Sequence, residues 1–187
     1  TKFYREVGDK IFRSKLTQEA EASLLTLGGF AEIGRSCMLL ETRESKIILD
    51  CGLNMSAKDS LAAIPRFDIA GISMEDIDAI VLSHAHLDHT GFLPALFKYG
   101  YRGPVYCTEP TLMLMSILQR DYLNHSGKDA LYSEQDINRA ITHAITLMHG
   151  IVTDISPDTK LVLSNSGHII GSTSIHLHIG NGEHNLV

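Results

Sequence analysis

The chain has 187 residues, of which 44% are hydrophobic and 20% charged, and this balance is typical of a folded globular chain rather than a disordered one. The formal net charge of −6 argues against a broad basic surface for nucleic acid, so most phosphate-contacting charge would have to come from elsewhere. No apolar stretch approaches the roughly 20 residues that a membrane helix needs, so we expect no membrane association. The three cysteines are widely spaced and form no Cys-x-x-Cys pair, which predicts reduced core thiols in a cytoplasmic protein.

Residues 1–20 differ from the rest of the chain because basic and apolar residues mix there without a clean period. The basic residues are Lys2, Arg5, Lys10, Arg13 and Lys15. Two interpretations stay open: a basic linker arm from an upstream module, or a solvated arm. Since the chain begins with Thr rather than Met, we expect a fragment or a processed product, with one folded domain over 21–187.

Short apolar runs bounded by turn residues predict strands in the first part of this domain. The expected strands are 23–27, 37–41, 46–50 and 77–83, and the spacing at 42–45 suits a hairpin with a four-residue turn. Residues 53–72 are expected to be loop-rich, since they contain Pro65 and Gly71. The Ser-x-x-Asp form of 73–76 predicts the start of a helix.

The second half alternates helix and strand and then becomes all β. The expected helices are 92–98, 110–124 and 133–145, with a strand at 105–108. The expected strands of the tail are 146–155, 160–164, 173–179 and 184–187, and Asn181-Gly182 is a hairpin signal between the last two. This order predicts an α/β fold (α+β mixed) with two sheets and helices packed outside them.

The most informative segment is His-Ala-His-Leu-Asp-His at 84–89, directly after the strand expected at 77–83. Imidazole and carboxylate donors suit Zn²⁺. His84 and His86 share a face if the backbone stays extended, whereas Asp88 and His89 lie past the bend and can face a second ion. A solvated polar loop would explain one such histidine more readily than four donors in six positions. The segment therefore predicts a dinuclear zinc centre.

The best third donor for the first ion is His168, in Ser-Gly-His-Ile-Ile-Gly-Ser at 166–172. Flanking glycines permit a sharp loop between two predicted strands. His176 and His178 alternate within a strand, so we interpret them as a polar sheet face rather than as ligands. The remaining histidines, at 125, 143, 149 and 184, are interpreted as structural or solvated.

These motifs resemble the metallo-β-lactamase superfamily, and more narrowly its β-CASP branch, in the archaeal group similar to the cleavage and polyadenylation specificity factor ribonuclease. The resemblance rests on the segments 27–37, 48–52, 83–94 and 166–172. The zinc motif alone would also fit lactamases, glyoxalases and tRNA-processing enzymes. The glycine-rich segment 27–37 and the Gly-Tyr-x-Gly-Pro run at 100–104 favour the mRNA 3′-end nuclease group.

The resemblance implies a metallo-β-lactamase αββα sandwich and a set of zinc ligands. The first zinc would be bound by His84, His86 and His168, and the second by Asp88 and His89. Asp88 would also be catalytic, because it would help to position the nucleophile. Asp50 would be an outer carboxylate that orients a ligand histidine, which has independent physical sense. The alternative for Asp50 is a strand-end residue that caps a turn.

The family continues past the last hairpin with a strand, a bridging aspartate, the β-CASP domain and the rest of the fold. The chain stops at Val187, before these features. We therefore expect 21–187 to be the N-terminal part of a C-terminally truncated domain, catalytically inactive by itself. An open sheet edge also favours pairing with another chain, such as a homodimer.

The main hypothesis is a zinc-dependent RNA endonuclease, with or without 5′→3′ exonuclease activity, in mRNA 3′-end processing or transcription termination. Its RNA would be bound mainly by regions outside the chain, such as an upstream module of the KH type. One alternative is a hydrolase of thioesters or lactams on the same scaffold, which would lack a β-CASP insert. The other is a non-catalytic scaffold or dimerisation module.

Overall fold

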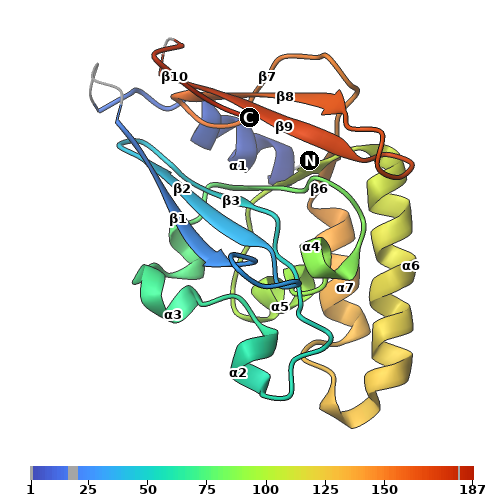
Figure 1. The fold of residues 1–187 in the computed structure, drawn as a ribbon. Coiled ribbons are helices and arrows are strands. Elements are labelled where there is room, and N and C mark those ends of the chain that lie inside the picture. Colours follow the sequence, from blue (N-terminus) through green and yellow to red (C-terminus); the bar gives the residue numbers. More distant parts are fainter. Residues whose placement is uncertain (1, 17–20, 181) are drawn as a thin grey trace.

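Two stacked β-sheets and a group of helices on one side form the fold in the computed structural model, which describes residues 2–16, 21–180 and 182–187 (Figure 1). The first sheet has the strand order β1-β2-β3-β4-β5-β6, and the second has the order β10-β9-β8-β7. The helices α5, α6 and α7 pack against the first sheet, whose other face meets the second sheet.

The first sheet combines an antiparallel half and a parallel half. Its strands are β1 (Ala22–Gly28), β2 (Cys37–Thr42), β3 (Lys46–Leu49), β4 (Ala79–Val81), β5 (Val105–Cys107) and β6 (Ala144–Thr146). The predicted hairpin at 42–45 is confirmed, since β2 and β3 pair antiparallel across it. From β3 onward all pairings are parallel. The carboxyl ends of β3, β4 and β5 therefore meet at one edge of the sheet, which is where ligand sites form in such sheets.

The helical layer begins and ends at recognisable signals. Its members are α5 (Leu93–Lys98), α6 (Glu109–Ser126) and α7 (Glu134–Thr142). Thr108 caps α6 by accepting a hydrogen bond from the amide of Thr111, and Pro110 lies in the first turn, where a missing N–H costs little. The predicted capping pair of Ser133 and Asp136 is confirmed at the start of α7.

The second sheet is antiparallel and includes the predicted hairpin at its end. Its strands are β7 (Thr153–Asp154), β8 (Thr159–Asn165), β9 (Thr173–Ile179) and β10 (His184–Leu186). The strands β9 and β10 pair antiparallel as expected, although Asn181 of the turn lies outside the described residues.

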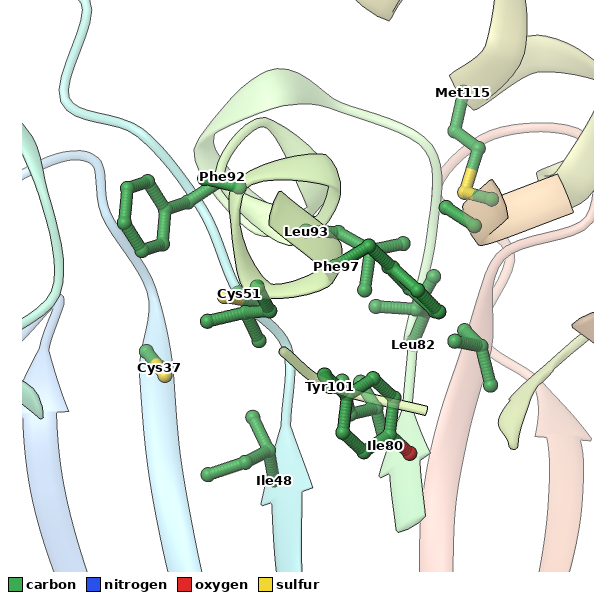
Figure 2. Close-up of a cluster of buried hydrophobic side chains, with 14 of the residues drawn as sticks. Cys37, Ile48, Cys51, Ile80, Leu82, Phe92, Leu93, Phe97, Tyr101 and Met115 are labelled. Carbon is green, nitrogen blue, oxygen red and sulfur yellow. The ribbon is translucent and has the colours of Figure 1, made fainter. Parts of the chain in front are cut away.

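Two hydrophobic cores lie on the two faces of the first sheet. Ile48 of β3 points into the core beneath the helices, with Leu82 and Phe97 (Figure 2). Its neighbour Ile47 points into the core between the sheets, with Leu161. Because side chains alternate along a strand, the near-continuous apolar character of β3 and β4 reflects burial on both faces.

The structure differs from the sequence prediction at the amino terminus. Lys2–Ile11 forms the helix α1 rather than an arm without a period, and Val7 is buried on it. The ring of Phe3 packs edge-on against His143, with centroids 4.7 Å apart. Tertiary contacts on one side of the helix thus give order to a segment whose mixed composition suggested none. Residues 1 and 17–20 of the expected arm lie outside the described residues.

Two short helices, α2 (Ser60–Ala63) and α3 (Phe67–Ala70), lie within the stretch expected to be loop-rich. The helix start predicted at 73–76 is confirmed by the capping box of Ser73 and Asp76, although it begins only the short 3-10 turn η1 (Met74–Asp76). Two predicted boundaries further along the chain were wrong. The helix expected at 133–145 ends at Thr142, since Ala144 and Ile145 pair with β5 instead. Of the strand expected at 146–155, Thr146 belongs to β6, and only Thr153 and Asp154 form β7, which pairs with β8.

Candidate metal centre

The polar residues of the site follow the carboxyl ends of β3 and β4. Asp50 comes directly after β3, and Ser83 and His84 come shortly after β4. The short helix α4 (Leu87–Thr90) then carries Asp88 and His89. Backbone hydrogen bonds lock this arrangement, since the amide of Ser36 donates to Asp88 O at 2.8 Å and that of Cys51 donates to His89 O at 2.7 Å.

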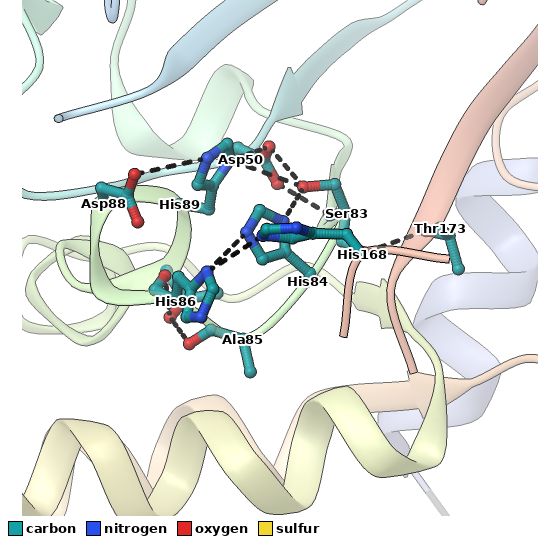
Figure 3. Close-up of polar contacts among 10 residues, drawn as sticks. Asp50, Ser83, His84, Ala85, His86, Asp88, His89, His168 and Thr173 are labelled. Carbon is teal, nitrogen blue, oxygen red and sulfur yellow. Dashed lines mark hydrogen bonds and ion pairs between the residues drawn. The ribbon is translucent and has the colours of Figure 1, made fainter. Parts of the chain in front are cut away.

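Three imidazoles converge in front of this sheet edge (Figure 3). His84 Nε2 lies 3.1 Å from His86 Nδ1, and His168 Nε2 lies 3.4 Å from the same nitrogen. One nitrogen from each ring lies within 4.8 Å of the other two, and the rings stand nearly perpendicular to one another. Three imidazole donors that approach one point from different directions fit a metal ion such as zinc.

Asp88 and His89 lie beside this triad. His89 Nε2 is 3.6 Å from Asp88 Oδ2, and the rings of His84 and His89 have centroids 4.1 Å apart. Within the described residues, the groups of three or more converging donors comprise the histidine triad alone. Asp88 and His89, the predicted ligands of a second ion, therefore lie beside the triad and supply two donors.

The carboxylate of Asp50 lies behind the histidines and contacts His89 directly. Asp50 Oδ2 is 2.7 Å from His89 Nδ1, and Asp50 Oδ1 accepts a hydrogen bond from the amide of Ser83 at 2.7 Å. The backbone of Asp50 adopts a left-handed conformation with φ of 56°, which costs free energy in a residue other than glycine. Such strain is typical of functional positions, and the contact with His89 fits an orienting carboxylate better than a simple turn cap.

Burial and charge push the pKa values of two histidines in opposite directions. Burial, reinforced by the neighbouring His89, lowers the pKa of His84 to about 4, so this imidazole is neutral at physiological pH. Burial alone would lower the pKa of His89 too, but the hydrogen bond and charge of Asp50 and the charge of Asp88 raise it overall. A proton therefore binds His89 more readily than His84. A metal ion would have to displace a proton more often at His89.

The loop that carries His168 is fixed by hydroxyl groups that the sequence analysis did not single out. Ser172 Oγ accepts hydrogen bonds from the amides of His168 and Ile169 at 3.1 and 3.0 Å. Thr108 Oγ1 donates to Gly171 O at 2.7 Å, and the amide of Thr173 donates to Ser83 O at 2.8 Å. The local signal for Ser172 was its place beside Gly171 in the motif, whereas Thr108 lies outside the motifs.

Two cavities flank His86 and leave the triad open to a ligand. One has a volume of about 370 Å³, with Ile33, Met55 and Asp88 in its wall. The other has a volume of about 520 Å³ and a largely apolar wall that includes Ile117 and Ile170. The site is therefore a histidine cluster at the junction of two open, mostly apolar hollows.

Two stacked sheets with histidines and an aspartate gathered at the carboxyl ends of the strands are typical of metal-dependent hydrolases. The comparison with protein families points to the same class. Residues 32–186 match the sequence model of the Metallo-beta-lactamase superfamily, and the chain belongs to this superfamily. The family and the histidine triad together indicate a metal-binding domain of the hydrolase type.

Among individual proteins, the chain is similar to transcription termination factors named FttA. It is 55% identical over 186 residues to FttA of Cenarchaeum symbiosum, and this match covers 98% of the chain and 29% of that protein. It is 46% identical over 186 residues to FttA of Methanocaldococcus jannaschii, covering 97% of the chain and 29% of that protein. The chain therefore spans about 29% of the length of these curated relatives.

Solved structures confirm the fold. A metallo-beta-lactamase with a HARLDQ motif from Cronobacter sakazakii aligns with a TM-score of 0.56 at 22% identity, over 85% of this chain and 56% of that chain. A protein of unknown function from Enterococcus faecalis V583 aligns with a TM-score of 0.60 at 17% identity, over 86% of this chain and 41% of that chain.

Within residues 2–16, 21–180 and 182–187, none of the helices is long and apolar enough to cross a membrane.

Proposed function

We propose that this chain supplies the main metal ligands of a transcription termination factor that cleaves RNA with zinc. The observation that carries the proposal is the convergence of His84, His86 and His168 beside Asp88 and His89. The chain that holds them is 55% identical to FttA of Cenarchaeum symbiosum over 98% of its own 187 residues. Residues 21–187 would form the N-terminal part of the metallo-β-lactamase domain, and residues 1–20 would lead into it from an upstream module.

The five donors would divide between two zinc ions. His84, His86 and His168 would hold the first, and Asp88 and His89 would contribute to the second. When bound, zinc supplies Lewis-acid activation of water and stabilises negative charge on phosphoryl oxygens. Asp88 would also hold the attacking water in position, and Asp50 would orient His89 through their 2.7 Å contact. All five donors are present, which is not expected of a scaffold that has lost catalysis.

The cavities beside His86 support a substrate with apolar parts near the reacting bond. Their walls are mostly aliphatic, so in this chain they would contact bases or ribose, while cationic contacts to phosphates would come from other regions. Similar walls could accept the apolar groups of a lactam or thioester, which keeps that hydrolase as the second candidate. Activity assays separate the two.

We further propose that the 187-residue chain is inactive by itself. Asp88 and His89 provide two donors, and a stable site for the second ion needs at least one more.

A homodimer stays a prediction, and measurement of mass in solution by light scattering would check it.

The sharpest test of the proposed function is a chimera in which this chain replaces the matching 29% of Cenarchaeum symbiosum FttA. We expect zinc-dependent cleavage of single-stranded RNA, and a loss of at least about 100-fold for Asp88→Ala, because Asp88 would be a direct ligand and loss of an outer partner of a ligand already costs about 10–100-fold. Asp121→Ala, an exposed carboxylate on α6, is the matched control and should keep full activity. Unchanged RNA cleavage in Asp88→Ala would refute the proposal, and hydrolysis of a lactam or thioester without RNA cleavage would favour the second candidate.

A further inference from the structure

Ser83 links the two halves of the metal centre through one hydroxyl group (Figure 3). Ser83 Oγ lies 2.7 Å from Asp50 Oδ2 and 2.9 Å from His84 Nδ1. The same oxygen of Asp50 is 2.7 Å from His89 Nδ1. One carboxylate oxygen is therefore in contact with His89 directly and with His84 through the serine.

The number of protons on these groups decides the direction of each hydrogen bond. A serine hydroxyl has one proton to donate, and an ionised carboxylate has none. Two oxygens only 2.7 Å apart need a proton between them, and Ser83 is the partner that has one. Because that proton is used toward Asp50, the 2.9 Å contact with His84 requires His84 Nδ1 to donate to Ser83 Oγ.

We propose that Ser83 is a positioning residue whose hydroxyl holds His84 in the Nδ1–H tautomer, so that Nε2 keeps its lone pair for the metal. This inference deepens the metal centre proposed above and rests on it. His84 Nε2 is the atom that faces the cluster, at 3.1 Å from His86 Nδ1. A neutral imidazole carries its proton on one nitrogen only, so fixing it at Nδ1 leaves the ligand atom free.

The backbone of Ser83 adds a second constraint. Its amide donates to Asp50 Oδ1 at 2.7 Å, and its carbonyl oxygen accepts from the amide and the hydroxyl of Thr173 at 2.8 and 3.1 Å. Ser83 thus contacts Asp50 behind the site and β9 next to the loop of His168. The residue sets the ring of His84 relative to both neighbours, so its loss would weaken the first metal position.

The tautomer is directly measurable without metal. In the metal-free chain labelled with ¹⁵N-histidine, long-range ¹H–¹⁵N correlation spectra distinguish an Nδ1–H ring from an Nε2–H ring, and His84→Gln identifies the signals of His84. We expect Nδ1–H for His84 in the native chain and in Ser83→Thr, which keeps the hydroxyl. In Ser83→Ala we expect a shift toward Nε2–H or an average of both forms.

Zinc affinity, measured by competition with a chromophoric chelator, gives the second readout. We expect Ser83→Ala to bind zinc about 10–100-fold more weakly, as is typical when an outer partner of a ligand histidine is removed. Ser83→Thr should stay near the native affinity, and Ser174→Ala, an exposed serine on β9, is the matched control.

The outcomes separate this inference from the proposed function. An Nε2–H ring for His84 in the native chain, or a Ser83→Ala variant with native tautomer and native zinc affinity, would overturn the role of Ser83 while zinc binding itself stood. If neither the native chain nor any variant bound zinc, the zinc centre would be refuted. The expected tautomer pattern would then still support the hydrogen bond between Ser83 and His84. The native and Ser83→Thr spectra decide the tautomer even if Ser83→Ala does not fold.

Discussion

The backbone of Gly52 lies so close to the carbonyl oxygen of Asp88 that a Cβ atom at position 52 would come within 1.6 Å of it. The neighbouring amide of Cys51 donates to His89 O at 2.7 Å, so the segment after β3 lies directly against α4. Backbone contacts thereby hold the strand end that carries Asp50 against the helix that carries Asp88 and His89, in addition to the side-chain contact between Asp50 and His89.

This contact predicts that Gly52→Ala disrupts the site. Since the clash is with backbone, α4 or the loop must move, and we expect a loss of about 3 kcal/mol or more in the free energy of unfolding. Chemical denaturation would measure it. Gly8→Ala is the matched control, because a Cβ there meets nothing within 4 Å, and in the helix α1 it should be neutral or slightly stabilising. Equal stability of the two variants would contradict the packing argument.

The histidine triad predicts the zinc content of the isolated chain. Elemental analysis of purified protein should find about one zinc per chain, because three protein ligands and a water complete a tetrahedral site. His86→Ala should lose it, since His86 Nδ1 is in contact with both other rings. His176→Ala should keep it, because that ring stacks on His178 away from the triad. Retention of zinc in His86→Ala would show that the ion is bound elsewhere.

The capping pair at the start of α7 predicts a pH-dependent contribution to stability. Burial tends to raise the pKa of Asp136, but hydrogen bonds from Ser133 and the charge of Arg139 outweigh it and lower the pKa below its usual value. A carboxyl with a lowered folded pKa stabilises the protein above its unfolded pKa, and this stabilisation is lost as pH falls through the folded pKa.

We therefore expect Asp136→Asn to lower the free energy of unfolding by about 1 kcal/mol at neutral pH, the usual scale for a lost cap. The difference from the native protein should shrink as the solution becomes acidic enough to protonate Asp136. Glu183→Gln, at an exposed position, should show no such difference at either pH. A gap between Asp136→Asn and the native protein that is independent of pH would argue against the charge as its source.

The buried cysteines predict thiols that do not react in the native protein. Cys37, Cys51 and Cys107 are free and buried. Burial raises the pKa of Cys107 to about 12 and raises that of Cys51 well above its usual value, so little thiolate is present at neutral pH.

A colorimetric disulfide reagent should therefore detect no thiol in the native chain and all three in denaturant. Ser174→Cys would place a thiol at an exposed position of β9 and should react at once. Rapid reaction of the native chain without the added cysteine would mean that the core under the helices opens far more readily than its packing indicates.

Local sequence signals predicted most of the strands and the histidine triad. The residues at 84–89 lie within one loop and one helical turn, so their spacing alone brings His84, His86, Asp88 and His89 together whatever the rest of the chain does. His168 was found because glycines on both sides permit the sharp loop that it needs. The strands β2, β3 and β9 followed from their apolar runs and turns.

Other features depended on contacts between segments that are distant in sequence. Ala144 and Ile145 continue a helical pattern, yet they form β6 because β5 has a free edge that offers backbone hydrogen bonds. Asp50 could equally have capped a turn, and only the parallel pairing of β3 with β4 brings it to Ser83 and His89. The set of donors could be predicted from the sequence, because ligand spacing within a loop is local. The hydrogen bonds that orient those donors could not, because they depend on partners that only the folded sheet brings near.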